Sequence, residues 1–379
     1  MKNDDSKFRT VFHALCDAID AGAFVPGRRM PSEKALTERF EVSLPTIRRA
    51  GQDLVAMGML EKRGGDGTYV LPDDDGPGNR CVHFLYGKYE AEIQKHLVRL
   101  VREEALRRGI RCRTGSCEAV EFADVVRKHI RRALPTLVLG DTLLGEDAIT
   151  LIGKYPGLFV VISNRLDHLG IPSVVGNDYA GIQLLMAMLH NLGHHRIGLL
   201  FENNRSPIEA IQMAMWKSCC RGNVPRALEF NANVPPGGSP QLPAQRVVES
   251  QLRESGATAL IALNNQLAIG ALRAARKLNL GVPRDLSVVS FYDFGLGPEC
   301  ERKLGGLDCN YPGHIEQAFE LLLGNSTRNS PELLRVIEPA LIEGDTVSGA
   351  PAARNRIPSE KRGWEASSME ISNMQQWKL

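Results

Sequence analysis

Two pairs of adjacent basic residues near the N-terminus have the chemistry to bind nucleic acid. Arg48-Arg49 and Lys62-Arg63 can each neutralise backbone phosphates, which releases counterions and makes the affinity salt-dependent. The second pair precedes Gly64-Gly65-Asp66-Gly67, where the missing side chains let the backbone approach a phosphate or a groove. Residues 28–63 carry eight basic and five acidic side chains, a net charge of only +3. On charge alone, a solvated basic face is as good an interpretation as a DNA contact surface.

Helical and hairpin patterns show how these residues would be positioned. Apolar residues recur at helical spacing near the N-terminus and form a first helix. Ser32 and Ser43 are N-cap residues for a second and a third helix, and Gly58 ends the third. Residues 59–63 and 68–71 then form a β-hairpin around the glycine-rich tip. This order predicts a winged helix-turn-helix, whose third helix enters the major groove of DNA.

The exposed residues of the third helix, the wing and the loops before them are the candidate DNA contacts. This set is Arg28, Lys34, Ser43, Leu44, Thr46, Arg48, Arg49, Lys62, Arg63, Gly65 and Gly67. Two such domains on a homodimer would bind a pseudo-palindromic operator in double-stranded DNA, because half-sites mirror the two-fold symmetry of the protein.

The string from Gly22 to Val70 closely resembles the DNA-binding domain of the GntR family. The matching features, in order, are Pro26-Gly27, Pro31-Ser32-Glu33, Val42-Ser43, Thr46-Ile47-Arg48, the helix end from Leu54 to Gly58, and Gly67-Thr68-Tyr69-Val70. The resemblance implies a transcription regulator. The family often has Arg after the Val-Ser pair, where this chain has Leu44-Pro45. We therefore expect Arg48, Arg49 and the wing to contact the bases.

The length and composition of the chain indicate a protein of more than one domain. It has 379 residues, of which 43% are hydrophobic, and a net charge of +2. We expect a DNA-binding domain at 1–71, a linker at 72–80, a large domain at 81–349 and a disordered tail at 350–379. Without a long apolar run or a secretory signal, a cytoplasmic protein that contacts no membrane is expected, and its eight cysteines indicate free thiols.

The large domain alternates buried strands with amphipathic helices. Such alternation predicts an α/β domain with doubly wound parallel sheets covered on both faces. The expected strands are 81–86, 136–140, 158–163, 197–201, 259–263 and 287–291. The expected helices are 91–108, 123–133, 180–192, 245–254, 266–278 and 314–323.

Two stretches of the large domain, 174–200 and 257–294, resemble the effector-binding domain of LacI-type repressors. The strongest parts are Asp178, Gly193-His194 and Val282-Pro283-Arg284-Asp285-Leu286-Ser287. The resemblance implies a two-lobe fold of the periplasmic-binding-protein type, as in arabinose-type repressors, which dimerises and closes over a small ligand, expected to be a sugar. Residues after the strand ends are the candidate ligand contacts: Tyr86, Tyr89, Asp141, Asn164, Arg165, Asp178, Asn203, Arg205, Asn265, Tyr292 and Asp293.

Several departures leave the identity of the ligand open. Asn265 stands where relatives usually have Asp, and the Arg-x-x-Gly common after the strand at 197–201 is missing. One alternative is therefore a regulator with a degenerate effector site. Another is a small-solute-binding protein without a DNA role.

No pattern in the sequence indicates an enzyme, a cofactor or a metal. A phosphate-binding glycine loop with Lys-Ser/Thr and a nucleophile elbow are both missing from the sequence. His194-His195 is adjacent to the strand at 197–201, so a structural role is expected there rather than metal binding. The predicted function is a DNA-binding transcription regulator, a repressor, modulated by a small ligand. An enzyme built on the same effector fold is a third class, which turnover of a sugar or a phosphate substrate would reveal.

Overall fold

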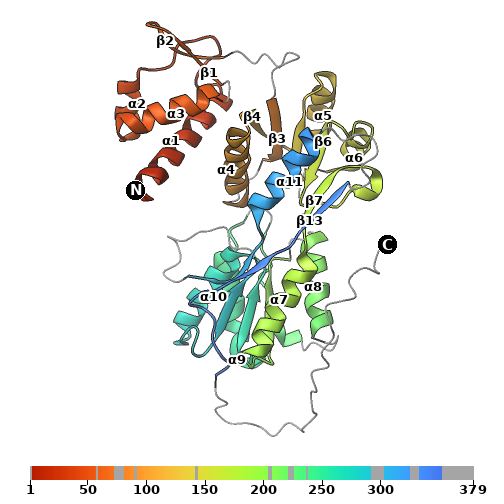
Figure 1. Ribbon diagram of the computed structural model, residues 1–379. Coiled ribbons are helices and arrows are strands. Elements are labelled where there is room, and N and C mark those ends of the chain that lie inside the picture. Colours follow the sequence, from red (N-terminus) through yellow and green to blue (C-terminus); the bar gives the residue numbers. More distant parts are fainter. Residues whose placement is uncertain are drawn as a thin grey trace.

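The N-terminal part of the chain forms a small helical head with a β-hairpin. The computed structural model describes residues 2–56, 59–71, 81–88, 92–140, 144–203, 207–220, 226–235, 238–291, 303–324 and 333–351. The head consists of α1 (Lys2–Asp20), α2 (Glu33–Phe40), α3 (Leu44–Ala56), β1 (Leu60–Arg63) and β2 (Gly67–Val70). The antiparallel hairpin pairs Leu60 with Val70 and Arg63 with Gly67. The predicted winged helix-turn-helix is confirmed (Figure 1).

Local sequence explains the turn between the two short helices of the head. The Ser32 side chain accepts a hydrogen bond from the backbone N–H of Ala35 and caps α2. Glu41 ends α2 in the left-handed conformation, with φ of 52°. The apolar faces of the three helices bury Phe12, Ile47 and Leu54 between them. The two short helices are thereby held in one orientation by a common core.

The first lobe of the large domain is built on a fully parallel six-stranded sheet. Its strand order is β13-β7-β6-β5-β3-β4, and each neighbouring pair is parallel. The elements are β3 (Cys81–Gly87), α4 (Glu92–Arg107), β4 (Arg111–Cys117), α5 (Phe122–Arg131), β5 (Thr136–Leu139), α6 (Glu146–Gly153), β6 (Phe159–Ile162), β7 (Ser173–Gly176), α11 (Tyr311–Leu323) and β13 (Leu334–Ile337).

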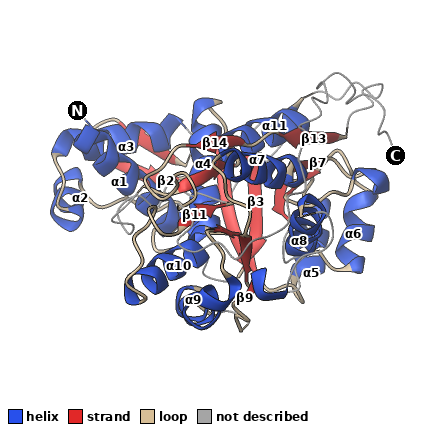
Figure 2. Cartoon of the chain, turned by 90° about the horizontal axis from the view of Figure 1, so that it is seen from below, coloured by secondary structure: helices blue, strands red, loops and turns tan. Residues whose placement is uncertain are grey.

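The second lobe repeats this plan with one antiparallel edge strand. Its order is β14-β12-β11-β10-β8-β9, and only β14 runs against its neighbour. The elements are α7 (Asp178–Asn191), β8 (Ile197–Phe201), α8 (Pro207–Cys219), β9 (Glu229–Asn231), α9 (Gln241–Ser255), β10 (Ala259–Ala262), α10 (Asn265–Lys277), β11 (Ser287–Ser290), β12 (Gly305–Asp308) and β14 (Ala340–Ile342). Figure 2 shows helices around the strands.

The chain crosses between the lobes three times. The crossings lie between β7 and α7, between β12 and α11, and between β13 and β14. The first and third are tied together, because the Asn177 side-chain amide donates to both Glu338 carboxylate oxygens at 2.9 and 3.1 Å. Two doubly wound lobes joined by several crossings are the predicted fold, which is thereby confirmed.

The head packs against the first lobe through α1. Arg102 of α4 is 2% exposed and donates to Asp17 and Asp20 of α1, each at 2.7 Å. Thr114 of β4 donates to the same Asp20 carboxylate at 2.8 Å. Arg9 of α1 pairs with Glu103 of α4 at 3.1 Å. Figure 1 shows α1 beside α4 and β4, and the apolar cores of head and lobe are continuous.

Several elements of the sheets lack the pattern that predicts strands. The local patterns predict no strand at β4, β7, β9, β12, β13 or β14, and no helix at α6 or α8. Strand β4 reads Arg-Cys-Arg-Thr-Gly-Ser-Cys, and β12 reads Gly-Gly-Leu-Asp. All six unpredicted strands lie at or next to a sheet edge, and they are short or polar, so they lack the long apolar run that predicts a central parallel strand. The expected linker at 72–80 and nearly all of the expected tail at 350–379 fall outside the described residues.

Candidate nucleic-acid interface and effector site

The third helix presents two arginines with different surroundings. Arg48 is exposed, and its Nε lies 2.9 Å from Glu33 of α2, whose side chain is also exposed. Exposed ion pairs of this kind contribute little and are easily exchanged for another anion. The guanidinium of Arg49 lies over the ring of Phe8 in α1, 4.0 Å from its centroid. Arg48 is therefore better placed to reach a ligand, whereas Arg49 also contributes to packing within the head.

The expectation that the Thr46 side chain is exposed is wrong. Thr46 is 5% exposed, and its hydroxyl lies 2.8 Å from the Ser43 hydroxyl. The Ser43 carbonyl accepts the backbone N–H groups of Thr46 and Ile47, which makes the first turn of α3. Thr46 follows the exposed Leu44-Pro45 pair, so the helix start turns it inward. Its role is to fix the turn, and Ser43 and Leu44 remain at the surface.

The wing holds its aromatic residue and its charges in a compact arrangement. The Tyr69 hydroxyl donates to Asp66 at 2.7 Å, which raises the pKa of the phenol. Arg63 stacks on the same ring at 4.2 Å and pairs with Glu61 at 3.1 Å. Gly65 and Gly67 have φ of 76° and 131°, which side-chain-bearing residues rarely adopt. These glycines are required by the turn itself.

The remaining basic candidates surround the wing and the helices. Arg28, Lys34 and Lys62 are exposed. The Arg28 carbonyl accepts the Val70 N–H, and Arg29 bridges to Tyr69, so the loop at 27–30 adds an edge to the hairpin. A Cβ at Gly67 would lie 2.5 Å from the Arg29 side chain, which identifies a close approach that the sequence analysis did not single out. The head thus carries exposed cations on α2, α3 and the wing.

The predicted ligand residues of the first lobe lie at the carboxyl ends of its strands. Asn164 follows β6, and its amide donates to the Gly140 carbonyl after β5 at 3.3 Å. Arg165 pairs with Asp167 at 3.0 Å and is 61% exposed. Tyr86 is the penultimate residue of β3 and lines a cavity next to α1 rather than a space defined between the lobes. Burial raises the pKa of its phenol.

The second lobe places its predicted residues at the equivalent ends. Asp178 is the first residue of α7, at the first crossing. Asn203 follows β8 with φ of 61°, and its amide lies 3.4 Å from Asn233. Asn265 is the first residue of α10 and is 1% exposed. Tyr89, Asp141, Arg205, Tyr292 and Asp293 lie outside the described residues.

Asn265 has an unsatisfied amide. Both its Oδ1 and its Nδ2 are buried without a hydrogen-bond partner in the described part of the chain. A buried amide in this state is unfavourable by about 1–3 kcal/mol. Next to it, Asn264 caps α10 and donates to Glu202 at 2.6 Å, a pair that the sequence analysis missed. The Asn-Asn sequence before a helix could have indicated the cap, but not the contact with Glu202.

His194 has the structural role expected for it. It is fully buried, with Nδ1 2.9 Å from the Thr258 hydroxyl and Nε2 2.9 Å from the Ser348 carbonyl. Burial lowers the pKa of its imidazole. Within the described ranges, no group of three metal-ligating side chains occurs, and no helix there is long and apolar enough to cross a membrane.

Two segments of the chain match known protein families. Residues 7–70 match the family described as bacterial regulatory proteins, gntR family. Residues 186–347 match the periplasmic binding protein-like domain. The two matches occur in the order that the sequence resemblances predicted.

Similar proteins are found both by sequence and by the fold of the large domain. The arabinose metabolism transcriptional repressor of Geobacillus stearothermophilus is 26% identical over 310 residues, covering 79% of this chain and 85% of that protein. The repressor ascG of Escherichia coli superposes with a TM-score of 0.61 at 19% identity, covering 71% of this chain and 99% of that one. A LacI family regulator from Enterococcus faecium with bound ribose superposes with a TM-score of 0.57 at 18% sequence identity. The superposition covers 71% of this chain and 99% of that one.

The two domains seen in the structure agree with the families and proteins that the chain matches. Every protein named above is a transcription regulator, and the structures share the fold of the large domain. The chain therefore combines a match to the DNA-binding domain of gntR-family regulators with a match to a periplasmic binding protein-like domain, which is the organisation of a ligand-modulated transcription regulator.

Proposed function

We propose that the protein is a repressor that binds its operator through α3 and the wing and responds to a sugar held between its two lobes. The observation that carries the proposal is that one chain combines an exposed basic head with two lobes, between which the described chain crosses three times. The Arg48 side chain contacts a base edge, and Lys62 and Arg63 contact phosphates. Neither a cofactor nor a catalytic group is part of this function.

The ligand site in this proposal includes the buried Asn265 amide. Amide groups donate to and accept from sugar hydroxyls, and a ligand would supply the partners that Asn265 lacks. Similar proteins named for arabinose or holding ribose make a monosaccharide the first class to test. Closure of the lobes over the sugar would change the position of the head and alter operator affinity by about 1–3 kcal/mol, the usual range of allosteric coupling.

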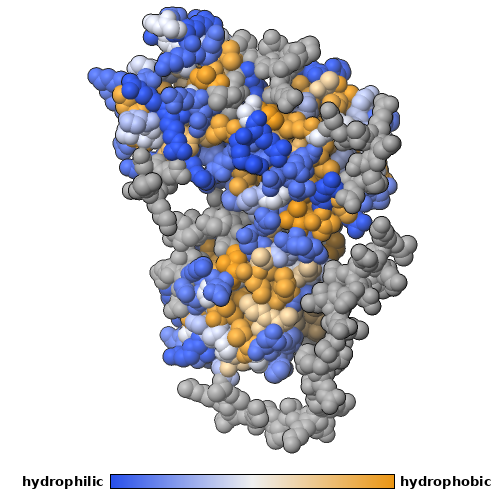
Figure 3. All heavy atoms as spheres, in the orientation of Figure 1, coloured by the Kyte–Doolittle hydropathy of each residue, from blue (hydrophilic) through white to orange (hydrophobic). Residues whose placement is uncertain are grey.

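A homodimer completes this mechanism. Apolar side chains gather on the face of the second lobe seen in Figure 3, and Tyr179 of α7 and Ile211 of α8 are each 51% exposed. Exposed apolar patches mark protein interfaces. Two effector domains joined there would place two heads on a pseudo-palindromic operator. We expect the protein to be a homodimer in solution and to act in the cytoplasm.

A binding experiment tests the two halves of the proposal separately. The full-length protein is titrated on the DNA upstream of its own gene, with and without each of a panel of pentoses and hexoses. We expect specific, salt-dependent binding that one sugar weakens at least fivefold. Thermal-shift measurements on the same sugars identify direct binding, because a ligand that binds only the folded protein raises its stability.

Two variants assign the sugar response to its site. Asn265→Ala should abolish the thermal shift and the effect on DNA, whereas Asn191→Ala, which removes an exposed amide at the end of α7, should leave both unchanged. DNA binding without any sugar response would indicate the degenerate effector site. A sugar response without DNA binding would indicate a solute-binding protein, and sugar turnover an enzyme.

A further inference from the structure

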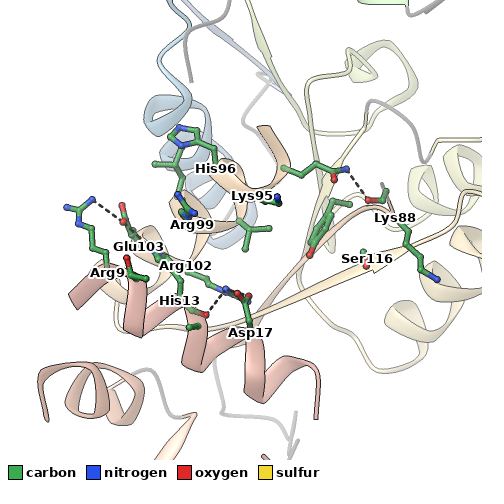
Figure 4. A pocket seen from close by; sticks show the side chains of 17 residues that line it. Arg9, His13, Asp17, Lys88, Lys95, His96, Arg99, Arg102, Glu103 and Ser116 are labelled. Carbon is green, nitrogen blue, oxygen red and sulfur yellow. Dashed lines mark hydrogen bonds and ion pairs between the residues drawn. The ribbon is translucent and has the colours of Figure 1, made fainter. Parts of the chain in front are cut away.

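A large cavity lies between the head and the first lobe. Its volume is about 1010 Å³, and its walls come from α1 on one side and from α4, β3 and β4 on the other. Figure 4 shows Arg9, His13 and Asp17 of α1 facing the side chains of α4, with Lys88 and Ser116 on the wall farthest from them. The cavity exists only while the head is packed on the lobe.

Cationic side chains outnumber carboxylates in this cavity. The lining side chains in the described part of the chain include five lysines and arginines but only Asp17 and Glu103 as acids, a net charge of +3 with histidine neutral. Each acid pairs with a cation of the cavity, Asp17 with Arg102 at 2.7 Å and Glu103 with Arg9 at 3.1 Å, and Arg102 is shared with Asp20. The lining cations outside these two pairs include Lys88 and Arg99.

Arg99 is the cavity cation that is best placed to bind a ligand. It is exposed and makes no hydrogen bond or ion pair within the described ranges. Lys88 has Glu118 only at 4.0 Å, with both side chains more than half exposed. An arginine with this freedom can bind a phosphate oxygen pair in a bidentate manner.

His13 adds a second, independent indication of a ligand. It is 7% exposed, its Nδ1 has no hydrogen-bond partner among the described residues, and its Nε2 lies 3.7 Å from Glu103, whose carboxyl pKa it lowers. An unsatisfied buried donor is unfavourable. The hydroxyls of Tyr86 and Ser116 line the same cavity and are further donors. Hydrogen-bond donors beside a surplus of cations suit an anion better than a neutral sugar.

We propose that this cavity binds a small phosphorylated polyanion, of a size between a sugar phosphate and a nucleotide, at a site distinct from the one between the lobes. Its volume is at the upper end of the range for small-ligand sites. Because the head and the lobe both supply walls, the polyanion binds the packed arrangement better than any separated one. It therefore holds the head on the lobe and gives the regulator a second, independent input.

Isothermal titration of the full-length protein with inorganic pyrophosphate at low ionic strength tests the site. We expect saturable binding of one pyrophosphate per chain, and inorganic phosphate should compete more weakly. Arg99→Gln should weaken binding at least tenfold, because it removes an exposed cation of the cavity. Arg131→Gln, which removes an exposed charge of α5 on the same lobe, should bind as the unaltered protein does.

A variant on the head separates a cavity between two domains from a site on the lobe alone. Ala14→Glu places a carboxylate on the α1 wall and should also weaken pyrophosphate binding. Circular dichroism melts of all variants establish that they fold. Pyrophosphate should, in addition, slow the hydrogen exchange of α1 amides in the unaltered protein.

Several results would overturn the proposal. These are a lack of saturable binding, equal losses in Arg99→Gln and Arg131→Gln, or unchanged binding in Ala14→Glu. Random-sequence DNA that displaces pyrophosphate, together with weaker DNA binding by Arg99→Gln, would instead assign the cations to the DNA backbone. None of these outcomes bears on the sugar site, which Asn265 variants test separately.

Discussion

At the scale of single residues, side chains of the same type have different roles because their neighbours differ. Arg48 and Arg49 are adjacent, yet one pairs with an exposed glutamate and the other stacks on Phe8. Thr46, two residues before Arg48, is turned inward and fixes the start of α3. The chemistry of the DNA-binding surface is therefore set by helix phase as much as by residue type.

The two arginines should separate in a mutational test. Arg48→Ala should weaken operator binding by about 1–3 kcal/mol if it contacts a base, and should lower the free energy of unfolding little, because its ion pair is exposed. Arg49→Ala should lower the stability of the head by about 1 kcal/mol, because it loses a cation–π contact. Operator and random DNA are compared by gel shift, and urea melts give the stability. An equal loss of Arg48→Ala on both DNAs would assign it to phosphate.

At the scale of elements, the position of α1 is decided by one buried guanidinium. Arg102 lies between Asp17 and Asp20, but only Asp20 is well buried, with an 11% exposed side chain against 68% for Asp17. Burial raises the pKa of Asp20, and Arg102 partly opposes this rise. The pairs hold the head helix against α4 and β4, which in turn creates the cavity beside them.

Asp20→Asn should loosen the head from the first lobe. It leaves a buried arginine with one exposed carboxylate, a loss on the order of 3 kcal/mol. Asp17→Asn is the matched control and should lose less than about 1 kcal/mol, because that carboxylate is exposed. Hydrogen exchange of α1 amides reports the loosening, and urea melts of the full-length protein give the free energies. Equal effects of the two variants would show that the buried pair does not hold the head.

At the scale of the whole molecule, buried neutral histidines recur in both lobes. His129 in α5, His194 before β8 and His314 in α11 are each at most 6% exposed. Burial lowers the pKa of all three imidazoles, that of His129 to about 4 with His83 as the next cause. Burial in the fold therefore favours the uncharged form of these rings.

Stability should therefore fall on acidification. Below about pH 6.5 the unfolded chain binds protons that the folded chain excludes, so the free energy of unfolding decreases as the pH drops toward 4. Urea melts between pH 7 and 4 measure this slope. His129→Gln should make the slope shallower, because it removes the imidazole whose pKa burial lowers to about 4. A pH-independent stability over this interval would refute the neutral state of the buried rings.

The sequence by itself determined the two domain types, because their signals are local. The Ser32 cap, the glycines at 65 and 67 and the alternation of apolar strands with amphipathic helices depend on neighbours within a few residues. Polar edge strands such as β4 carry no such signal, since their pairing partners are distant in the chain. The local pattern also did not predict that the Thr46 side chain is buried.

Only the tertiary structure decided which distant residues meet. Nothing in the sequence marks Arg102 as the partner of Asp17 and Asp20, more than eighty positions away, or His13 and Arg99 as walls of one cavity. Such contacts depend on how α1 packs on the lobe, which is a property of two complete surfaces and not of a motif. The head and the effector fold can therefore be recognised from local patterns, whereas their junction, and the site it creates, exist only in the folded chain.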